Sequence, residues 1–178
     1  MSSIASVASA AADLSASFGG KLLKPTDEGY EWARKVHNGL VDKRPALIAR
    51  CSSVADVVDA VALATKLGLE VAVRGGGHNV AGRATIDGGI MIDLSPMKGV
   101  HVDAVGKTVR AQGGVTWGEV NRETQLHGLG VTGGVVSTTG IAGLTLGGGL
   151  GCTGERPFGA RPPDTHSAAD EQVRPSTG

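Results

Sequence analysis

The 178-residue chain lacks the features that mark several large classes of protein. Its 17 basic residues balance its 17 acidic residues, so it has no excess positive charge of the kind that nucleic-acid-binding domains carry. Charged residues or glycine interrupt each apolar stretch well before the roughly 18 residues that a membrane helix needs. We therefore expect neither nucleic acid nor membrane as a partner, and small metabolites or cofactors remain.

Cysteine is scarce, and so is any pattern that would hold a metal. Cys51 and Cys152 are the only two, and they form no C-x-x-C pair, so the sequence indicates neither a zinc site nor a disulfide framework. The histidines share no metal-binding spacing. Residues 1–17 are rich in serine and alanine and lack the basic and apolar regions of a secretory signal. We expect a cytoplasmic protein with a flexible leader over residues 1–29.

Two strands and a helix are predicted in the first half. Residues 46–49 form a short apolar run typical of a buried strand, and Ser52 and Ser53 offer an N-cap for a helix with apolar residues at three-and-four spacing. Gly68 ends that helix, and alternating apolar residues at 69, 71 and 73 then predict a strand. The three elements make a β-α-β unit, which is typical of a parallel sheet.

From Gly88 onward the pattern changes to short strands at 90–94, 100–103 and 108–111, of which the last two predict an antiparallel hairpin. Thr116 and Glu119 match a capping box that opens a helix ending before Gly128. Trp117 is expected to pack beneath that helix. The chain is therefore predicted to be α+β, with a small βαβ parallel subdomain and a partial, mainly antiparallel subdomain.

Glycine is the residue in excess, with 29 residues, concentrated between residues 75 and 151 without a collagen period. The stretch RGGGHN, residues 74–79, directly follows a predicted strand. Glycines there expose backbone N–H groups that can cradle a phosphate. The dinucleotide pattern G-x-G-x-x-G fails, because Val80 stands where the last glycine should be, and no Walker motif occurs.

Five segments in order carry a resemblance: RGGGHNVAG at 74–82, MIDLSPM at 91–97, GGVTWG at 113–118, HGL at 127–129 and GGVVSTTGIAGLTLGGGLG at 133–151. Together they resemble the FAD-binding domain of the berberine-bridge-enzyme-like flavoprotein oxidases, in the vanillyl-alcohol-oxidase superfamily. The resemblance runs over residues 30–151. It implies a PCMH-type FAD-binding fold and FAD as the cofactor.

The resemblance also implies roles for residues. The first glycine loop would hold the FAD pyrophosphate, and His78 would be bonded to the 8α-methyl carbon of the flavin, since a neutral imidazole is a competent nucleophile. The block at 133–143 would contact the cofactor through its backbone. No cysteine precedes that block, so a second covalent link is not expected. The residues assigned to FAD are Arg74, Gly75, Gly76, Gly77, His78, Asn79, Gly133, Gly134, Val136, Ser137, Thr139, Gly140 and Gly143.

The chain departs from the family pattern after residue 151. We expect residues 30–151 to be an FAD-binding domain incomplete at its C-terminal end, residues 152–178 to be a disordered or aberrant tail, and the substrate domain to be absent. The family reaction would be hydride transfer from an alcohol or amine carbon of a small molecule to FAD, reoxidised by O₂. No catalytic base can be assigned, and this chain alone is expected to be inactive.

Two alternatives remain at the level of sequence. One is a fragment of a noncovalent FAD dehydrogenase acting on 2-hydroxy acids, which the histidine of RGGGHN disfavours. The other is a flavin-free remnant or binding module that retains the glycine loops without their chemistry.

Overall fold

The computed structural model describes residues 4–149 and 174–175, which fall into two compact units, Met1–Met97 and Lys98–Gly178. The predicted tail over residues 152–178 lies outside the described residues, apart from the short strand β8 (Arg174–Pro175).

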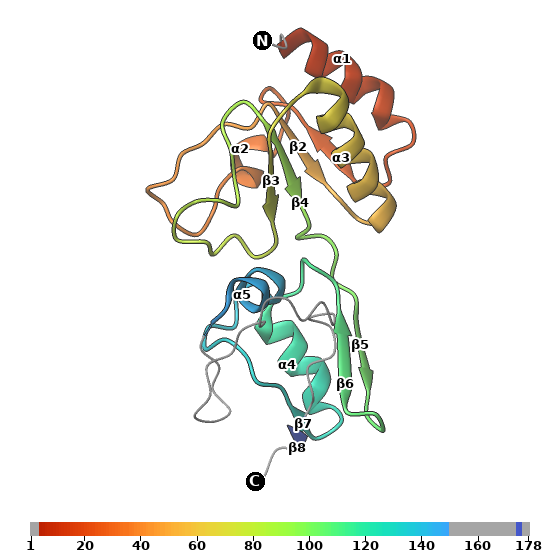
Figure 1. The fold of residues 1–178 in the computed structure, drawn as a ribbon, viewed down its shortest axis with the longest axis vertical. Helices are drawn as coiled ribbons and strands as arrows, with labels where there is room; N and C mark the ends of the chain where they lie inside the picture. Colours follow the sequence, from red (N-terminus) through yellow and green to blue (C-terminus); the bar gives the residue numbers. More distant parts are fainter. Residues whose placement is uncertain (1–3, 150–173, 176–178) are drawn as a thin grey trace. The chain divides into compact units, whose positions relative to one another are not determined.

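The first unit is built on a four-stranded sheet in the order β1 (Lys21–Leu23), β2 (Leu47–Arg50), β4 (Ile90–Asp93) and β3 (Val71–Arg74) (Figure 1). Strands β2, β4 and β3 run parallel, and β1 pairs antiparallel to β2. Helix α3 (Val54–Leu67) connects β2 to β3, which confirms the predicted β-α-β unit. Strand β4 was predicted as the first of the short strands after Gly88. In the structure it lies between β2 and β3 in this sheet.

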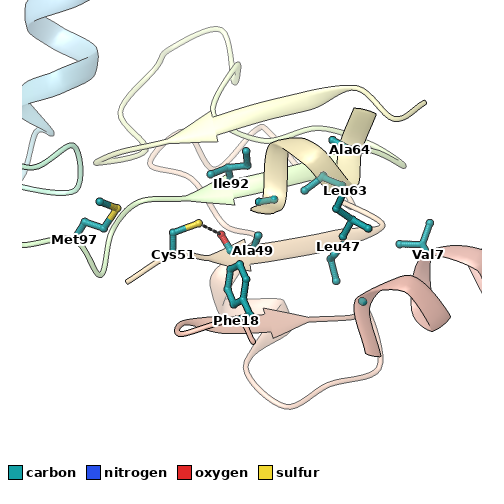
Figure 2. Packing of buried hydrophobic residues seen from close by; sticks show 12 residues of the cluster. Val7, Phe18, Leu47, Ala49, Cys51, Leu63, Ala64, Ile92 and Met97 are labelled. Atoms are coloured by element: carbon teal, nitrogen blue, oxygen red, sulfur yellow. Dashed lines mark hydrogen bonds between the residues drawn. The ribbon is translucent and has the colours of Figure 1, made fainter. Parts of the chain in front are cut away.

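Both faces of this sheet are covered, as the alternation along the central strands requires. Leu47 and Ala49 of β2, with Ile92 of β4, pack in one cluster with α1 (Ile4–Ser15) and α3 (Figure 2). Ile48 and Met91 point to the opposite cluster, where Tyr30 of α2 (Tyr30–Ala33) lies fully buried; its hydroxyl donates to the carbonyl of Pro45. Burying each such aliphatic side chain contributes about 1.5–3 kcal/mol.

On the edge strand β3 the alternating valines lie on the exposed face. The apolar residues Val71 and Val73 are exposed, and the buried position is Ala72 between them. Strand pairing with β4 fixes this register, with Ala72 beside Met91. The alternation predicted the strand correctly without indicating which face is buried.

The N-terminal segment differs from the expected flexible leader. Residues 4–15 form helix α1, with Val7 and Ala11 each only 3% exposed, and residues 21–23 form strand β1 of the sheet. Small side chains let α1 pack closely in the cluster that includes α3. A run of alanine and serine gives little hydrophobic signal in the sequence, and its burial becomes apparent only when its partners are in place.

Asp56 joins this N-terminal segment to the helix α3. Its buried carboxylate accepts hydrogen bonds from the backbone N–H groups of Gly19, Ser52 and Ser53, and Ser53 caps the helix in return. Burial alone would raise the pKa of the Asp56 carboxyl, but these hydrogen bonds outweigh burial and hold the pKa below its ordinary value of 3.8. At the other end Gly68 adopts φ 63° and ends α3 as predicted.

We predict that Asp56→Asn lowers the free energy of unfolding by about 2 kcal/mol, since an amide accepts fewer of these bonds and brings donors of its own. Because the folded pKa is depressed, the stabilisation is present above the unfolded pKa and is lost as pH falls through the folded pKa. Urea unfolding at pH 7 and at pH 3 measures both effects. Asp59→Asn, on the same helix, is the matched control; an equal loss in both variants would contradict the assignment.

The second unit contains the predicted hairpin, β5 (Val100–Asp103) and β6 (Thr108–Ala111), followed by α4 (Trp117–Gln125), β7 (Leu129–Gly130) and α5 (Ile141–Gly147). Strand β7 pairs with β8. The Thr116–Glu119 capping box is present, and Trp117 lies in the core of this unit with Val115 and Val120, as expected. The α+β class and the antiparallel hairpin are therefore confirmed.

Candidate functional site

At the carboxyl ends of the parallel strands, one carboxylate lies in register with two arginines. Asp93 of β4 is aligned with Arg50 of β2 and Arg74 of β3. Its side chain is fully buried, with Oδ2 at 3.1 Å from Arg50 Nε and Oδ1 at 3.7 Å from Arg74 Nε. Oδ1 also accepts from the N–H of Ser95 at 3.0 Å, so Asp93 closes the turn at the end of the strand. This row fixes the point at which the first glycine loop leaves the sheet.

The Arg74 side chain makes contacts within the protein itself. Besides facing Asp93, its guanidinium donates to the carbonyl of Ala33, the last residue of α2, and to that of Lys35 just after the helix. The sequence assigned Arg74 to the cofactor phosphates. That assignment stays a prediction, and in the structure the side chain ties the end of α2 and the residues after it to the base of the glycine loop.

The loop at 75–79 presents its carbonyls to the protein and leaves N–H groups available. The carbonyl of Arg74 accepts from Leu94 N–H at 2.8 Å, and that of Gly77 accepts from His37 N–H at 3.0 Å. Gly77 adopts φ 74°, a conformation that favours glycine. Within the described part of the chain, the N–H groups of Gly75 and Gly76 donate no hydrogen bond. Such a loop fits a phosphate group, which needs several donors and no side chain in the way.

At its C-terminal end the loop enters a turn, and side chains from an earlier segment donate hydrogen bonds to its backbone. The Asn79 side chain accepts from Arg83 N–H at 3.0 Å, so its amide shapes the turn. Asn38 donates to the carbonyl of Val80 at 2.9 Å, and Lys43 donates to the carbonyl of Gly82 at 3.3 Å. Residues 35–43 therefore hold the loop along its length, a role that no pattern in their sequence indicates.

His78 stacks on a second histidine that the sequence did not assign to the site. The rings of His37 and His78 lie with centroids 4.1 Å apart and planes 12° from parallel. Burial, and then the charge on His37, hold the pKa of the His78 imidazole below its usual 6.5, so His78 is neutral over a wider pH range than a solvated histidine. The two residues are 41 positions apart and His37 lies in an irregular segment, so no spacing rule could have paired them.

In the second unit, the glycines at the start of the second block have a packing role. A Cβ on Gly133 would overlap the six-membered ring of Trp117, and one on Gly134 would lie 2.5 Å from Leu144 Cδ2 and 2.9 Å from Trp117 Nε1. Since real Cβ atoms do not approach so closely, the chain can pass the indole only as glycine. These two glycines were predicted as cofactor contacts, and their identity is already explained by Trp117.

The next residues of the block turn toward solvent. The carbonyls of Ser137 and Thr139 accept from the N–H groups of Gly118 and Trp117 at the start of α4, at 2.9 and 3.0 Å. Val136 is 53% exposed and Ser137 is exposed, and among the described residues neither N–H has an acceptor. Gly140 is the N-cap of α5 and Gly143 lies on its first turn. The segment at 136–137 thus offers backbone donors, as the first loop does.

The remaining candidates have structural explanations. Cys51 is fully buried, its thiol donates to the carbonyl of Ala49, and burial raises its pKa to about 12 (Figure 2). With its pKa raised in this way, the thiol is protonated and unreactive at neutral pH. Over the described residues, no three His, Cys, Asp or Glu side chains are grouped as metal ligands, and none of the helices is long and apolar enough to cross a membrane.

An α+β domain with a glycine loop at the carboxyl ends of parallel strands belongs to a class that binds phosphate-bearing cofactors. The particular family follows from comparison: a family model described as an FAD binding domain matches residues 45–159, and the chain belongs to this family of FAD-binding domains. The family and its cofactor, FAD, are as the sequence predicted.

The individual relatives are FAD-linked oxidoreductases. The chain is 42% identical over 132 residues to (R)-6-hydroxynicotine oxidase of Paenarthrobacter nicotinovorans, covering 74% of this chain and 29% of that protein. It matches the BBE-like 1 protein of Physcomitrella patens at 27% identity with a TM-score of 0.73, covering 82% of this chain and 31% of that one. It therefore spans less than a third of these relatives.

A third relative is informative about the cofactor linkage. Glucooligosaccharide oxidase from Acremonium strictum, described with a 6-S-cysteinyl, 8α-N1-histidyl FAD, is 30% identical with a TM-score of 0.74, over 80% of this chain and 30% of that one. The PCMH-type fold and the berberine-bridge-enzyme-like resemblance are thereby confirmed.

We predict that Asp93→Asn lowers the free energy of unfolding by about 3 kcal/mol, because two arginine side chains then lose a buried counter-charge. Urea unfolding measures this loss. Glu70→Gln, which removes an exposed carboxylate just before β3, is the control and should stay within about 0.5 kcal/mol of the parent. Equal stability of the Asp93 variant and the parent would show that the row of charges does not hold the strand ends together.

Two glycine substitutions in the second unit should have opposite effects. Gly133→Ala should destabilise the unit by about 2 kcal/mol through overlap with Trp117. Gly143→Ala should stabilise it by about 0.5–1 kcal/mol, because residue 143 is helical and no described atom lies within 4 Å of the place that an alanine Cβ would occupy. Thermal unfolding followed by tryptophan fluorescence measures both, and a loss at both positions would contradict the packing explanation.

Proposed function

We propose that this chain is the FAD-binding part of a flavoprotein oxidoreductase and that it carries its FAD covalently on His78. The observation that carries the proposal is the His78 ring itself: it follows a loop with available N–H donors and stacks on His37, and burial lowers its pKa. A histidyl FAD in the related glucooligosaccharide oxidase supports the same linkage here.

The proposed residue roles follow from the contacts. Gly75 and Gly76 donate their N–H groups to the FAD pyrophosphate, and Gly77 supplies the turn that brings His78 back over the loop. Asn79 and Arg74 shape the loop from either end with their side chains. In the second unit, the backbone of Val136 and Ser137 would supply further N–H donors for FAD. Arg74, Asn79, Gly133, Gly134, Thr139, Gly140 and Gly143 stay predicted contacts.

His78 forms the linkage as a nucleophile. With FAD bound, a ring nitrogen of His78 would bond to the 8α-methyl carbon, the imidazole giving up its N–H proton and the methyl carbon a hydrogen. The cofactor would supply the acceptor for the two electrons released, with O₂ as the final oxidant. Only the neutral imidazole has a free lone pair on the attacking nitrogen, so the lowered pKa of His78 favours the reaction near neutral pH.

FAD, once bound, supplies a two-electron acceptor for oxidising a carbon centre. We propose that the whole protein oxidises an alcohol or amine carbon of a small molecule, a class that the names of the nicotine and oligosaccharide oxidases support. No catalytic base can be assigned among the described residues, so we expect this chain alone to show no efficient turnover. A cytoplasmic location remains a prediction from residues 1–17.

Intact mass of the purified, acid-denatured protein, together with its visible absorbance, tests the linkage. We expect the parent protein to be yellow and to retain the mass of one FAD, and His78→Ala to lose that mass. His127→Ala, which removes an exposed histidine of the second unit, is the control and should retain it.

The other outcomes separate the alternatives. A yellow protein that releases all its flavin on denaturation would contradict the covalent linkage and favour the noncovalent dehydrogenase. A colourless, unmodified protein after incubation with excess FAD would favour the flavin-free binding module.

A further inference from the structure

His37 contacts the residue proposed to carry the cofactor, yet it has no place in the glycine motifs. Its ring lies 4.1 Å from the His78 ring, with the two planes within 12° of parallel. A parallel stack restricts rotation of both rings, and rotation of the His78 ring would change the direction in which its nitrogens point. The geometry of the pair therefore bears on nucleophilic attack.

We propose that His37 is a positioning residue for flavin attachment: its stacked ring holds the His78 ring in one orientation on the glycine loop. The inference rests on the proposed function, because it assigns a role in the linkage at His78. It goes beyond that function by naming the residue that prepares the nucleophile.

The backbone around His37 is held firmly enough for such a role. Its own N–H donates to the carbonyl of Gly77, the residue directly before His78. On one side of His37, the carbonyl of Lys35 accepts from the Arg74 guanidinium, and on the other side Asn38 donates to the carbonyl of Val80. Three hydrogen bonds thus tie residues 35–38 to both sides of His78, so the His37 ring is fixed relative to the loop.

Charge makes the pair more than a packing contact. Two protonated imidazoles stacked at this distance repel each other, so the pair favours a neutral His78. The other charged groups on the segments around His78 are mostly cationic. They are Lys35, Lys43, Arg74 and Arg83, while Asp42 pairs with Arg34 and Asp93 with Arg50 and Arg74.

Three variants separate the ring from the charge. His37→Ala removes both, His37→Phe keeps a flat ring that can stack but cannot ionise, and His101→Ala removes an exposed histidine of β5 as a control. The purified, flavin-free protein is mixed with excess FAD in air, and covalent attachment is followed by intact mass from pH 5 to pH 9. The pKa of the His78 ring is measured in parallel by NMR on flavin-free protein, and thermal unfolding checks that each variant is folded.

We expect His37→Ala to attach FAD at least roughly tenfold more slowly, and His37→Phe and His101→Ala to stay near the parent rate at pH 8. We also expect the pKa of His78 to rise in His37→Ala, and to rise less in His37→Phe, where burial is retained. The acidic limb of the rate profile should move to higher pH in the same order.

The failures are distinguishable. If the parent protein attaches no FAD, the proposed linkage fails, and with it this role for His37. If the parent attaches FAD and folded His37→Ala attaches it at the parent rate, only the positioning role is overturned. If His37→Phe is as slow as His37→Ala, stacking does not position His78. A general loss of folding would also return the pKa of His78 toward its ordinary value, so only variants that thermal unfolding shows to be folded are compared, and folded His37→Phe then tests the stacking by itself.

Discussion

The buried carboxylate of Asp93 is the constraint on which the first unit's candidate site depends. A fully buried charge is costly unless it is paired, and parallel pairing of β4 with both neighbours places an arginine beside it on each side. Any slip in register would separate the carboxylate from both arginines. The ends of β2, β4 and β3 are therefore held in register, and with them the start of the glycine loop.

Arg74 connects Asp93 to the residues that precede His37 in the chain. It contacts Asp93 on one side and the carbonyls of Ala33 and Lys35 on the other, so the same side chain sets the sheet edge and the segment that leads to His37. His37 in turn donates its N–H to Gly77 and stacks on His78. A continuous set of contacts thus connects a charge in the sheet to the orientation of one imidazole ring.

Elements with local causes could be predicted from the sequence, and those with distant causes could not. Helix α3 and its ends follow from Ser53, Asp56 and Gly68, residues within or next to it. The family resemblance likewise identified His78 through the glycines directly before it. The packing of α1, the place of β4 between its neighbours and the approach of His37 to His78 each depend on partners far along the chain. No local pattern encodes such contacts.

The two glycine blocks differ in what requires glycine. Gly133 and Gly134 leave room for the indole of Trp117, whereas Gly75 and Gly76 leave N–H groups without acceptors in the described chain. The difference bears on how the proposed phosphate site could work in a protein of zero net charge. Arg74, the cation nearest in sequence to the loop, already contacts the protein, so in the proposed site the attraction for phosphate comes from the backbone dipoles of Gly75 and Gly76.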